Sequence, residues 1–310
     1  MKLDFGKVKT YPLKKRRSKV HKEDLAALGR KGVKFREFYK GLPNILAAKD
    51  IRKISDNIVT AHKKKRAVIF MLGAHVIKCG LSPVIIDLMK KKVVSAVALN
   101  GAGIIHDTEL ALTGRTSEDV GAALKKGLFG MAKETAEFIN GAINRGVEEG
   151  MGIGISVGER ILKERLPLSN ISILASAAKY NIPVTVHVAI GTDIIHQHPS
   201  CNGAAVGEGS LIDFRNLIYS VIRLNRGGIC INFGSAIILP EVFLKALNIA
   251  RNLGHSVKNF TTANFDMITH YRPEMNVLKR PTTGGGRGYN IIGHHEIMMP
   301  LLYQMIIEKL

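Results

Sequence analysis

An imidazole and a carboxylate stand side by side at His106 and Asp107, just after a glycine turn at residues 100–103. Such a pair can share acid–base work, or hold a ribose hydroxyl or a substrate amine. The alternative for Asp107 is that it caps a helix beginning near Thr108. We predict a chemical role for His106 and leave both roles open for Asp107.

Further histidines gather around acidic residues. His187, His196 and His198 surround Asp193, and His294-His295-Glu296 precedes the last apolar stretch. Imidazole and carboxylate groups are ligands for zinc and iron. However, adjacent histidines on a helix point in different directions, and a proline follows His198. We predict that no metal is bound, and that these histidines donate hydrogen bonds to a ligand or are simply buried.

Lys279 is the candidate amine nucleophile, because it lies in a glycine-rich C-terminal segment next to Arg280. A lysine reacts as a free amine only when it is desolvated or has a cationic neighbour. The alternative is a solvated lysine in a loop.

The stretch Arg66–Thr113 contains the elements that would position these groups. The apolar residues 67–71 end at Gly73, a helix-length segment follows, and a second apolar run, 93–99, ends at Asn100-Gly101-Ala102-Gly103. Strand, glycine turn, helix, strand and glycine turn form a βαβ unit. Both turns follow strand ends, where such sheets bind ligands and helix N-termini attract anions.

The same alternation continues along the chain. Helices are predicted near residues 22–30, 44–65, 116–126, 129–149, 157–164, 170–180, 213–224, 241–253 and 291–310, strands at 183–188, 228–233 and 257–262, and a loop-like region at 266–290. We predict an α/β protein with a Rossmann-like, doubly wound, mostly parallel sheet of about six strands.

Charge is concentrated near the N-terminus. Residues 1–66 contain 21 Lys and Arg against 6 Asp and Glu. We predict a basic extension over 1–41 and a single α/β domain over 42–310. The basic segment could bind nucleic acid, although a solvated tail or a subunit contact is the simpler interpretation, because the chain has few aromatic residues and no tryptophan for stacking on bases.

The sequence also indicates a location. No uncharged run approaches the length of a membrane span, and no secretory signal is apparent. The cysteines at 79, 201 and 230 are widely spaced, which suits a reducing compartment. We therefore expect a cytoplasmic protein without membrane contact.

The order of several motifs resembles the deoxyhypusine synthase family. These motifs are GAHVIKCG, LNGAGIIHDTEL, NIPVTVHVAIGTD, NFGS, TTANFD with HYRPE, and GHHEIMMPLL, between residues 73 and 302. The resemblance implies a Rossmann-like NAD-binding fold and a homotetramer. It also implies oxidation of a polyamine and transfer of its aminobutyl group to an amine through an imine on an enzyme lysine.

The resemblance assigns roles to individual residues. It implies cofactor contacts at Ala74, His75, Val76, Ile77, Lys78, Asn100, Gly101, Ala102, Asp193, Gly234, Thr262, His294 and His295. It implies catalytic roles for His106, which replaces a family carboxylate, for Asp193, and for Lys279, which matches the family nucleophile only with a gap.

The sequence departs from the family where the polyamine would bind. The family's acidic pair is Ile105-His106 here, and the chain has no tryptophan. A polyamine needs carboxylates and aromatic faces, whereas histidines and basic residues are expected at this site. We predict an NAD-dependent transferase that moves an alkylamine (aminobutyl-type) group to an amine acceptor, with both substrates unassigned. The alternatives are an NAD- or nucleotide-dependent enzyme with a different, anionic substrate, and a nucleic-acid-binding protein.

Overall fold

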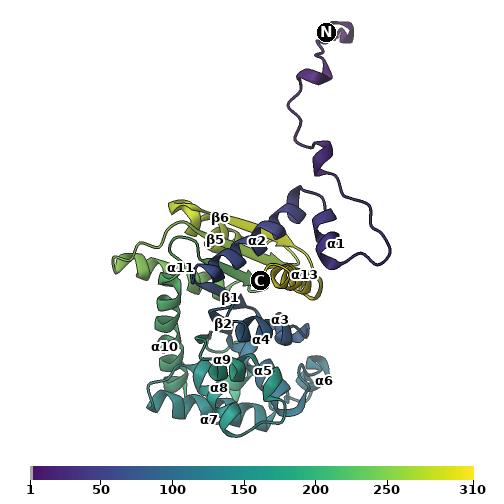
Figure 1. The fold of residues 1–310 in the computed structure, drawn as a ribbon. Coiled ribbons are helices and arrows are strands. Elements are labelled where there is room, and N and C mark those ends of the chain that lie inside the picture. Colours follow the sequence, from purple (N-terminus) through teal and green to yellow (C-terminus); the bar gives the residue numbers. More distant parts are fainter. Residues whose placement is uncertain (1–2) are drawn as a thin grey trace.

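A parallel β-sheet forms the centre of the protein, whose computed structural model describes residues 3–310 (Figure 1). Within these residues the sheet has six strands in the order β3-β2-β1-β4-β5-β6. Their bounds are β1 (Val68–Leu72), β2 (Ala96–Asn100), β3 (Val184–His187), β4 (Ile229–Phe233), β5 (Phe260–Asp266) and β6 (Gly286–Ile292). All neighbouring strands pair in parallel. The predicted Rossmann-like, doubly wound α/β fold is confirmed.

Helices connect the strands and cover both faces of the sheet. They are α1 (Phe35–Gly41), α2 (Leu46–Lys63), α3 (Ala74–Lys78), α4 (Ser82–Lys90), α5 (Gly101–Thr113), α6 (Val120–Leu124), α7 (Lys133–Glu148), α8 (Ile153–Lys163), α9 (Ile173–Tyr180), α10 (Gly203–Ile222), α11 (Ile238–Asn252), α12 (Tyr271–Pro273), which a π-helix over Glu274–Lys279 continues, and α13 (His295–Ile307). No helix in residues 3–310 combines the length and the apolar composition that a membrane crossing requires.

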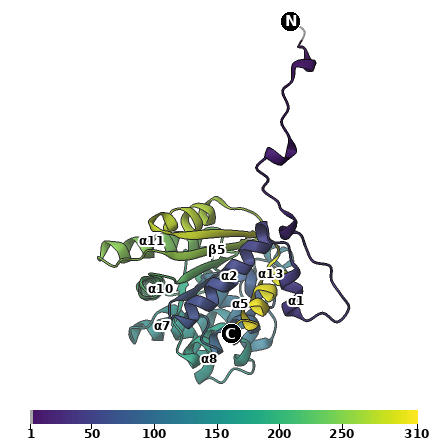
Figure 2. The same cartoon turned by 45° about the horizontal axis from the view of Figure 1, so that its top comes forward.

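Alternate residues of each strand point to opposite faces and bury two separate apolar layers. Phe70 of β1 packs in one layer with residues of α2, α5, α9 and α13. Met71, the next residue, packs in the other layer with residues of α10 and α11. Figure 2 shows α2 and α13 side by side over the sheet, in agreement with their contacts. The strand order reverses between β1 and β4, and at such a switch point doubly wound sheets leave a crevice at their carboxyl edge.

The C-terminal part of the sheet differs from the prediction. The fifth strand, predicted over 257–262, covers Phe260–Asp266 instead. The expected loop 266–290 contains helical turns and most of β6. Asn264 can lie inside a strand because its neighbours are also asparagines. Asn232 donates to Asn264 at 2.8 Å, and Asn264 donates to Asn290 at 3.0 Å. This amide ladder satisfies both polar side-chain atoms of Asn264, a residue type that the sequence alone places at a strand end.

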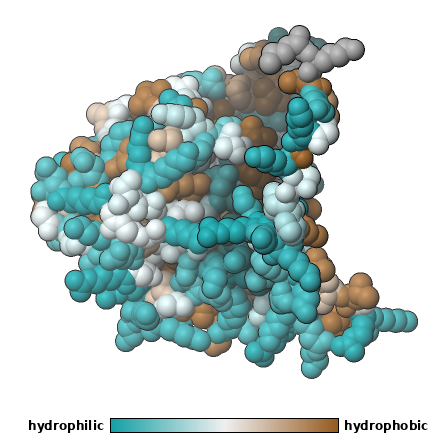
Figure 3. All heavy atoms as spheres, turned by 90° about the horizontal axis from the view of Figure 1, so that it is seen from above, coloured by the Kyte–Doolittle hydropathy of each residue, from teal (hydrophilic) through white to brown (hydrophobic). Residues whose placement is uncertain are grey.

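The N-terminal segment extends away from the rest of the protein (Figure 1). Every described residue from 3 to 23 is exposed. The predicted helix near 22–30 is only a single turn over Lys22–Asp24, because a short helix without a packing partner is unstable. Figure 3, which views the molecule from above, shows hydrophobic residues scattered among hydrophilic ones on this face. Leu3, Phe5 and Val8 are among the exposed apolar side chains of the segment. The boundary between residues 41 and 42 remains a prediction.

Candidate functional site

A cavity of about 230 Å³ opens at the carboxyl ends of β2 and β3, beside α5. It is lined by Lys78, Ala102, Ile105, His106, Glu109, Ser117, Glu118, Val120, Phe129, Thr192, Asp193 and Ile194. The structure thus brings together four residues that the sequence analysis assigned to the site: Lys78, Ala102, His106 and Asp193. They come from three separate strand ends, as expected for a ligand site of a parallel sheet.

Asp193 is held against the first turn of α5. A Cβ atom added to Gly101 would lie 1.9 Å from Asp193 Oδ2, so only glycine allows this approach. Asn100 caps the helix by accepting from the Gly103 amide at 3.1 Å. The sequence therefore uses glycine at this turn to seat a carboxylate at the positive end of the helix.

The Asp193 carboxylate lacks a full set of partners. Its side chain is 6% exposed, and Oδ2 is buried without a hydrogen bond. His196 Nδ1 accepts a hydrogen bond from the Gly191 amide, so the proton of the neutral ring is on Nε2. This Nε2 atom lies 4.0 Å from Asp193 Oδ2 and is also buried without a hydrogen-bond partner. Burial raises the pKa of Asp193 to about 6. A ligand cation would satisfy this carboxylate and favour its ionised form.

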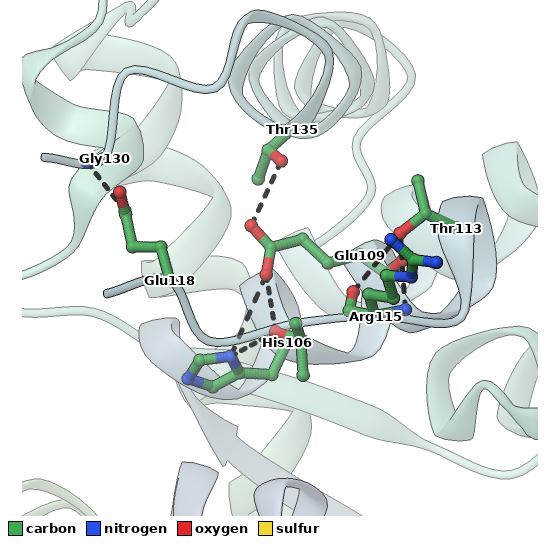
Figure 4. Close-up of polar contacts among 8 residues, drawn as sticks. His106, Glu109, Thr113, Arg115, Glu118, Gly130 and Thr135 are labelled. Carbon is green, nitrogen blue, oxygen red and sulfur yellow. Dashed lines mark hydrogen bonds and ion pairs between the residues drawn. The ribbon is translucent and has the colours of Figure 1, made fainter. Parts of the chain in front are cut away.

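His106 belongs to a hydrogen-bonded chain shown in Figure 4. Glu109 accepts from Thr135 Oγ1 at 3.1 Å and from Thr116 Oγ1 at 2.5 Å. Because the single hydroxyl proton of Thr116 goes to Glu109, the Thr116 oxygen must accept from His106 Nδ1, 2.6 Å away. This fixes the imidazole as the Nδ1–H tautomer and leaves Nε2 as a proton acceptor.

The protonation state of His106 suits a general base. Burial lowers its pKa, the Glu109 carboxylate partly opposes this shift, and the Lys78 ammonium adds to it. The ring is therefore neutral near pH 7, and Nε2 can take a proton from a group bound in the cavity.

The segment between α5 and α7 covers the cavity and supplies Glu118 and Phe129. Glu118 accepts from the Gly130 amide at 2.8 Å, and Gln197 donates to the Phe129 carbonyl at 2.9 Å. The expectation of a site lined mainly by histidines and basic residues is wrong for this cavity, since Glu109 and Glu118 were missed. Glu109 could have been found, because it lies four residues after Ile105 and so on the same helix face.

Asp107 has a structural role that neither prediction described. Helix α5 begins at Gly101, so Asp107 does not cap a helix at Thr108. It is fully buried, and accepts from Ser172 Oγ at 2.5 Å and from the amides of Ile173 and Leu174 at 2.7 and 3.1 Å. These are the first residues of α9, so Asp107 caps a neighbouring helix.

A second group of predicted residues lies at the switch point between β1 and β4. The rings of His75 and His295 are 6.0 Å apart, and a Cβ on Gly234 would lie 2.6 Å from His295 Nε2. Ala74 begins α3, and His294 is the N-cap of α13. Val76 and Ile77 are buried in the core, which leaves only their backbones available to a ligand.

Two predicted residues lie away from both groups. Thr262 is fully buried inside β5, in register with Cys230 and Gly288 rather than at a strand end. Lys279 ends the π-helix between β5 and β6; its side chain is 60% exposed, and its Nζ lies 2.6 Å from Glu274. The structure does not bring Lys279 to the cavity.

The histidines considered for metal binding have other surroundings. His187 is buried on β3 with Nε2 3.0 Å from the Thr185 hydroxyl, and His198 Nδ1 lies 2.8 Å from Ser200 Oγ. Among residues 3–310, no group of three or more His, Cys, Asp or Glu side chains is arranged to hold a metal ion.

Solved structures share this fold at low sequence identity. A protein from Entamoeba histolytica assigned as a deoxyhypusine synthase has a TM-score of 0.54 and 13% identity, over 90% of this chain and 94% of that chain. A conserved LOR/SDH protein from Methanococcus maripaludis S2 has a TM-score of 0.52 and 16% identity, over 84% and 69%. The ternary complex of AgrE with ornithine and NAD+ has a TM-score of 0.51 and 12% identity, over 84% of this chain but 33% of that chain.

These similarities establish the fold. No protein-family model and no curated protein sequence matches the chain. The resemblance to a deoxyhypusine synthase is therefore confirmed as a resemblance of structure, and the neighbours that share the fold include an enzyme solved with NAD+.

Proposed function

We propose that the protein is an NAD-dependent transferase that moves an alkylamine group, of the aminobutyl type, from an amine donor to an amine acceptor. One observation carries this proposal: the buried Asp193 carboxylate, whose Oδ2 has no hydrogen bond, lines a cavity that also holds Glu109, Glu118 and the base His106. A buried carboxylate without a partner is costly, and an ammonium group would stabilise it.

The charge of the cavity favours an amine over the anionic substrate considered from the sequence. Three carboxylates line it against the single ammonium of Lys78. An anion placed there would face like charges, which weakens binding. Phe129 and Ile105 add apolar surface for an aliphatic chain, and the aromatic face also attracts cations.

The residues at the switch point fit a nucleotide. Asp266 Oδ2 and His295 Nδ1 are buried without hydrogen-bond partners, at the end of β5 and the start of α13. Hydroxyl and amide groups of a nucleotide have the donors and acceptors that these atoms require. We assign cofactor contacts to Ala74, His75 and His294 around them, and to Asn100 and Gly101 at α5. When bound, NAD would supply the hydride acceptor for amine oxidation.

In this proposal His106 removes the proton that amine oxidation releases. Its Nδ1–H is committed to Thr116, so Nε2 is the acceptor, and the Glu109 carboxylate stabilises the imidazolium that forms. Asp193 and Glu118 hold the ammonium groups.

A thermal-shift titration tests the substrate class. We expect NAD+ and 1,4-diaminobutane each to raise the melting temperature, and succinate to have no effect; a ligand at a hundred times its Kd stabilises by about 2.7 kcal/mol. Glu118→Gln should abolish the diamine shift and keep the NAD+ shift, whereas Glu159→Gln, exposed on α8, should keep both. Stabilisation by succinate and not by the diamine would favour the anionic alternative.

A further inference from the structure

The segment between α5 and α7, residues 114–132, has few contacts with the rest of the protein. Gly130 is its only buried residue, and its helix α6 lies at the outer margin of the molecule (Figure 1). Apart from bonds at its two ends, three hydrogen bonds join it to the rest of residues 3–310: Thr116 bonds to His106 and to Glu109, and the Phe129 carbonyl accepts from Gln197. Segments with so little buried surface open at a lower free-energy cost than the core.

The backbone next to Thr116 is held in place by these bonds rather than by packing. Ser117 and Glu118 line both the cavity that contains His106 and a second cavity of about 470 Å³, so open space lies on both sides of them. Ser117 has a φ of 71°, in the left-handed region that residues with a side chain seldom adopt. Such a conformation persists only where its surroundings enforce it, and Thr116 supplies the adjacent contact. Loss of that contact therefore allows the segment to move away from α5.

The Thr116 hydroxyl also separates two groups of α5. It lies 2.6 Å from His106 Nδ1 and 2.5 Å from Glu109 Oε2, whereas these two atoms are 4.0 Å from each other. His106 and Glu109 are three residues apart, so they lie on the same face of the helix. Without the hydroxyl between them, the Nδ1–H group and the carboxylate can bond directly. The hydrogen bonding of His106 thus depends on whether residues 114–132 are in place.

We propose that residues 114–132 are a flap over the cavity, and that Thr116 is a positioning residue that couples closure of the flap to the state of His106. In the closed form, which the structure shows, Thr116 stands between His106 and Glu109, and Nε2 is free to accept a proton. In the open form Thr116 withdraws, and His106 bonds directly to Glu109. The use of His106 as a base rests on the proposed function, whereas the coupling between the flap and the imidazole does not.

The coupling makes the base available only when the flap is closed. A direct bond to the Glu109 carboxylate raises the pKa of His106 in the open form, because an adjacent negative charge favours the imidazolium. In the closed form burial lowers this pKa, with a smaller contribution from the Lys78 ammonium. The other charged groups that line the cavity are Asp193 and Glu118, and Glu118 moves with the flap. An imidazolium cannot accept a proton, so a ligand that contacts both α5 and the flap selects the form in which His106 is a base.

Imidazole 15N NMR of the full chain, labelled at histidine and without ligands, tests the coupling at pH 7. The signals of His106 are those that His106→Gln removes. We expect the wild-type ring to be neutral with its proton on Nδ1. Thr116→Val removes the hydroxyl, so the ring should be largely imidazolium and should titrate at a higher pH than in the wild type. Thr116→Ser should retain the wild-type signals, and Thr283→Val, at an exposed threonine outside the site, should not change them.

A variant at the other contact of the flap separates coupling from a local effect. Gln197→Ala removes the bond to the Phe129 carbonyl and leaves Thr116 and α5 unaltered. If the flap moves as one unit, the His106 signals should shift toward the imidazolium in this variant too, by less than in Thr116→Val. If they stay at the wild-type positions while the flap opens more often, Thr116 acts only locally and the coupling is wrong.

Hydrogen exchange at the Gly130 amide measures how often the flap opens. This amide is buried and donates to Glu118 within the flap, as Figure 4 shows, and a Cβ on Gly130 would lie 2.5 Å from Ile194, so it packs directly on the body. We expect exchange about tenfold faster in Thr116→Val and in Gln197→Ala than in the wild type, since each loses a contact of the flap. Thr283→Val should leave the rate unchanged. Exchange of Gly130 only through global unfolding would overturn the flap.

The outcomes separate this inference from the proposed function, because neither NMR nor hydrogen exchange requires NAD or an amine. If His106 keeps its wild-type signals in both variants, the flap coupling fails, and the thermal shifts with NAD+ and the diamine still decide the function. If both variants shift His106 but no ligand stabilises the protein, the coupling stands and the transferase proposal fails.

Discussion

At the scale of single residues, His106 and Asp107 are adjacent in the sequence but have different surroundings. His106 faces the cavity, whereas Asp107, the next residue of α5, is fully buried and holds the first turn of α9. The sequence placed both after a glycine turn, but it could not show where α5 begins or which helix lies behind it. The residue types predicted that either side chain could take part in chemistry, and only the packing of α5 against α9 shows which of the two faces the cavity.

Replacing Asp107 should destabilise the fold. Asp107→Ala leaves the Ser172 hydroxyl and two buried amides without their acceptor, and we expect a loss of about 3 kcal/mol in the free energy of unfolding. The control is Asp119→Ala, an exposed cap of α6, for which about 1 kcal/mol is expected. Denaturant unfolding monitored by circular dichroism measures both. Equal losses would show that Asp107 has no special structural role.

Asp193 should make stability depend on pH. Its folded pKa of about 6 is above its ordinary value of 3.8, so the folded protein holds a proton that the unfolded chain releases. This contribution is fully present below about pH 4 and is lost as the pH rises through 6; it amounts to about 3 kcal/mol. Asp193→Asn should therefore match the wild type near pH 4 and exceed its stability at pH 8. It should also lose the diamine shift.

Chemical denaturation of both proteins at several pH values checks this expectation. A variant that is equally destabilised at pH 4 and pH 8 would show that Asp193 serves only to pack against α5.

At the scale of elements, apolar periodicity predicted β1 to β4 and the main helices, because each buries a continuous apolar face. Apolar periodicity did not predict the strands between Thr262 and Asn290 correctly. There Asn264 continues a strand through the amide ladder, and Gly288 lies under the Leu278 backbone, where a Cβ would come within 2.7 Å of its carbonyl oxygen. Asparagine and glycine usually mark turns, so only long-range pairing could identify β6.

Position 101, the first residue of α5, should tolerate no side chain. Gly101→Ala places a methyl group against the Asp193 carboxylate, so we expect the diamine shift to be lost and the melting temperature to fall. Gly207→Ala is the matched control inside α10. It is exposed with nothing within 4 Å of the new Cβ, and it should stabilise by about 0.5–1 kcal/mol. A diamine shift retained in Gly101→Ala would contradict the assigned role of Asp193.

At the scale of the whole molecule, the basic N-terminal segment extends away from the folded body. None of the described residues 3–23 is buried, and their hydrogen bonds are local. Composition predicted the basic character of this segment, but not its partner. The homotetramer and nucleic-acid binding remain predictions from resemblance and charge.

Deleting residues 1–20 should leave the melting temperature of the folded body within about 1 °C of that of the full chain, because residues 3–20, the described part of this segment, are all exposed. The diamine and NAD+ shifts should also be unchanged. If the arm binds nucleic acid, the full chain should bind RNA or DNA with an affinity that falls steeply with salt, and the deletion should remove that binding. A large fall in melting temperature would show that the arm packs on the protein.

We propose above that an amine bound in this cavity is oxidised at the expense of NAD+. The most direct measurement is the absorbance of NADH after a polyamine is added to enzyme and NAD+, followed by addition of an acceptor amine. We predict that NADH forms on the first addition and is consumed on the second, and that His106→Gln slows both by about a hundredfold. Failure of every amine to produce NADH in a protein shown to bind NAD+, or NADH formed only from an anionic substrate, would contradict the account.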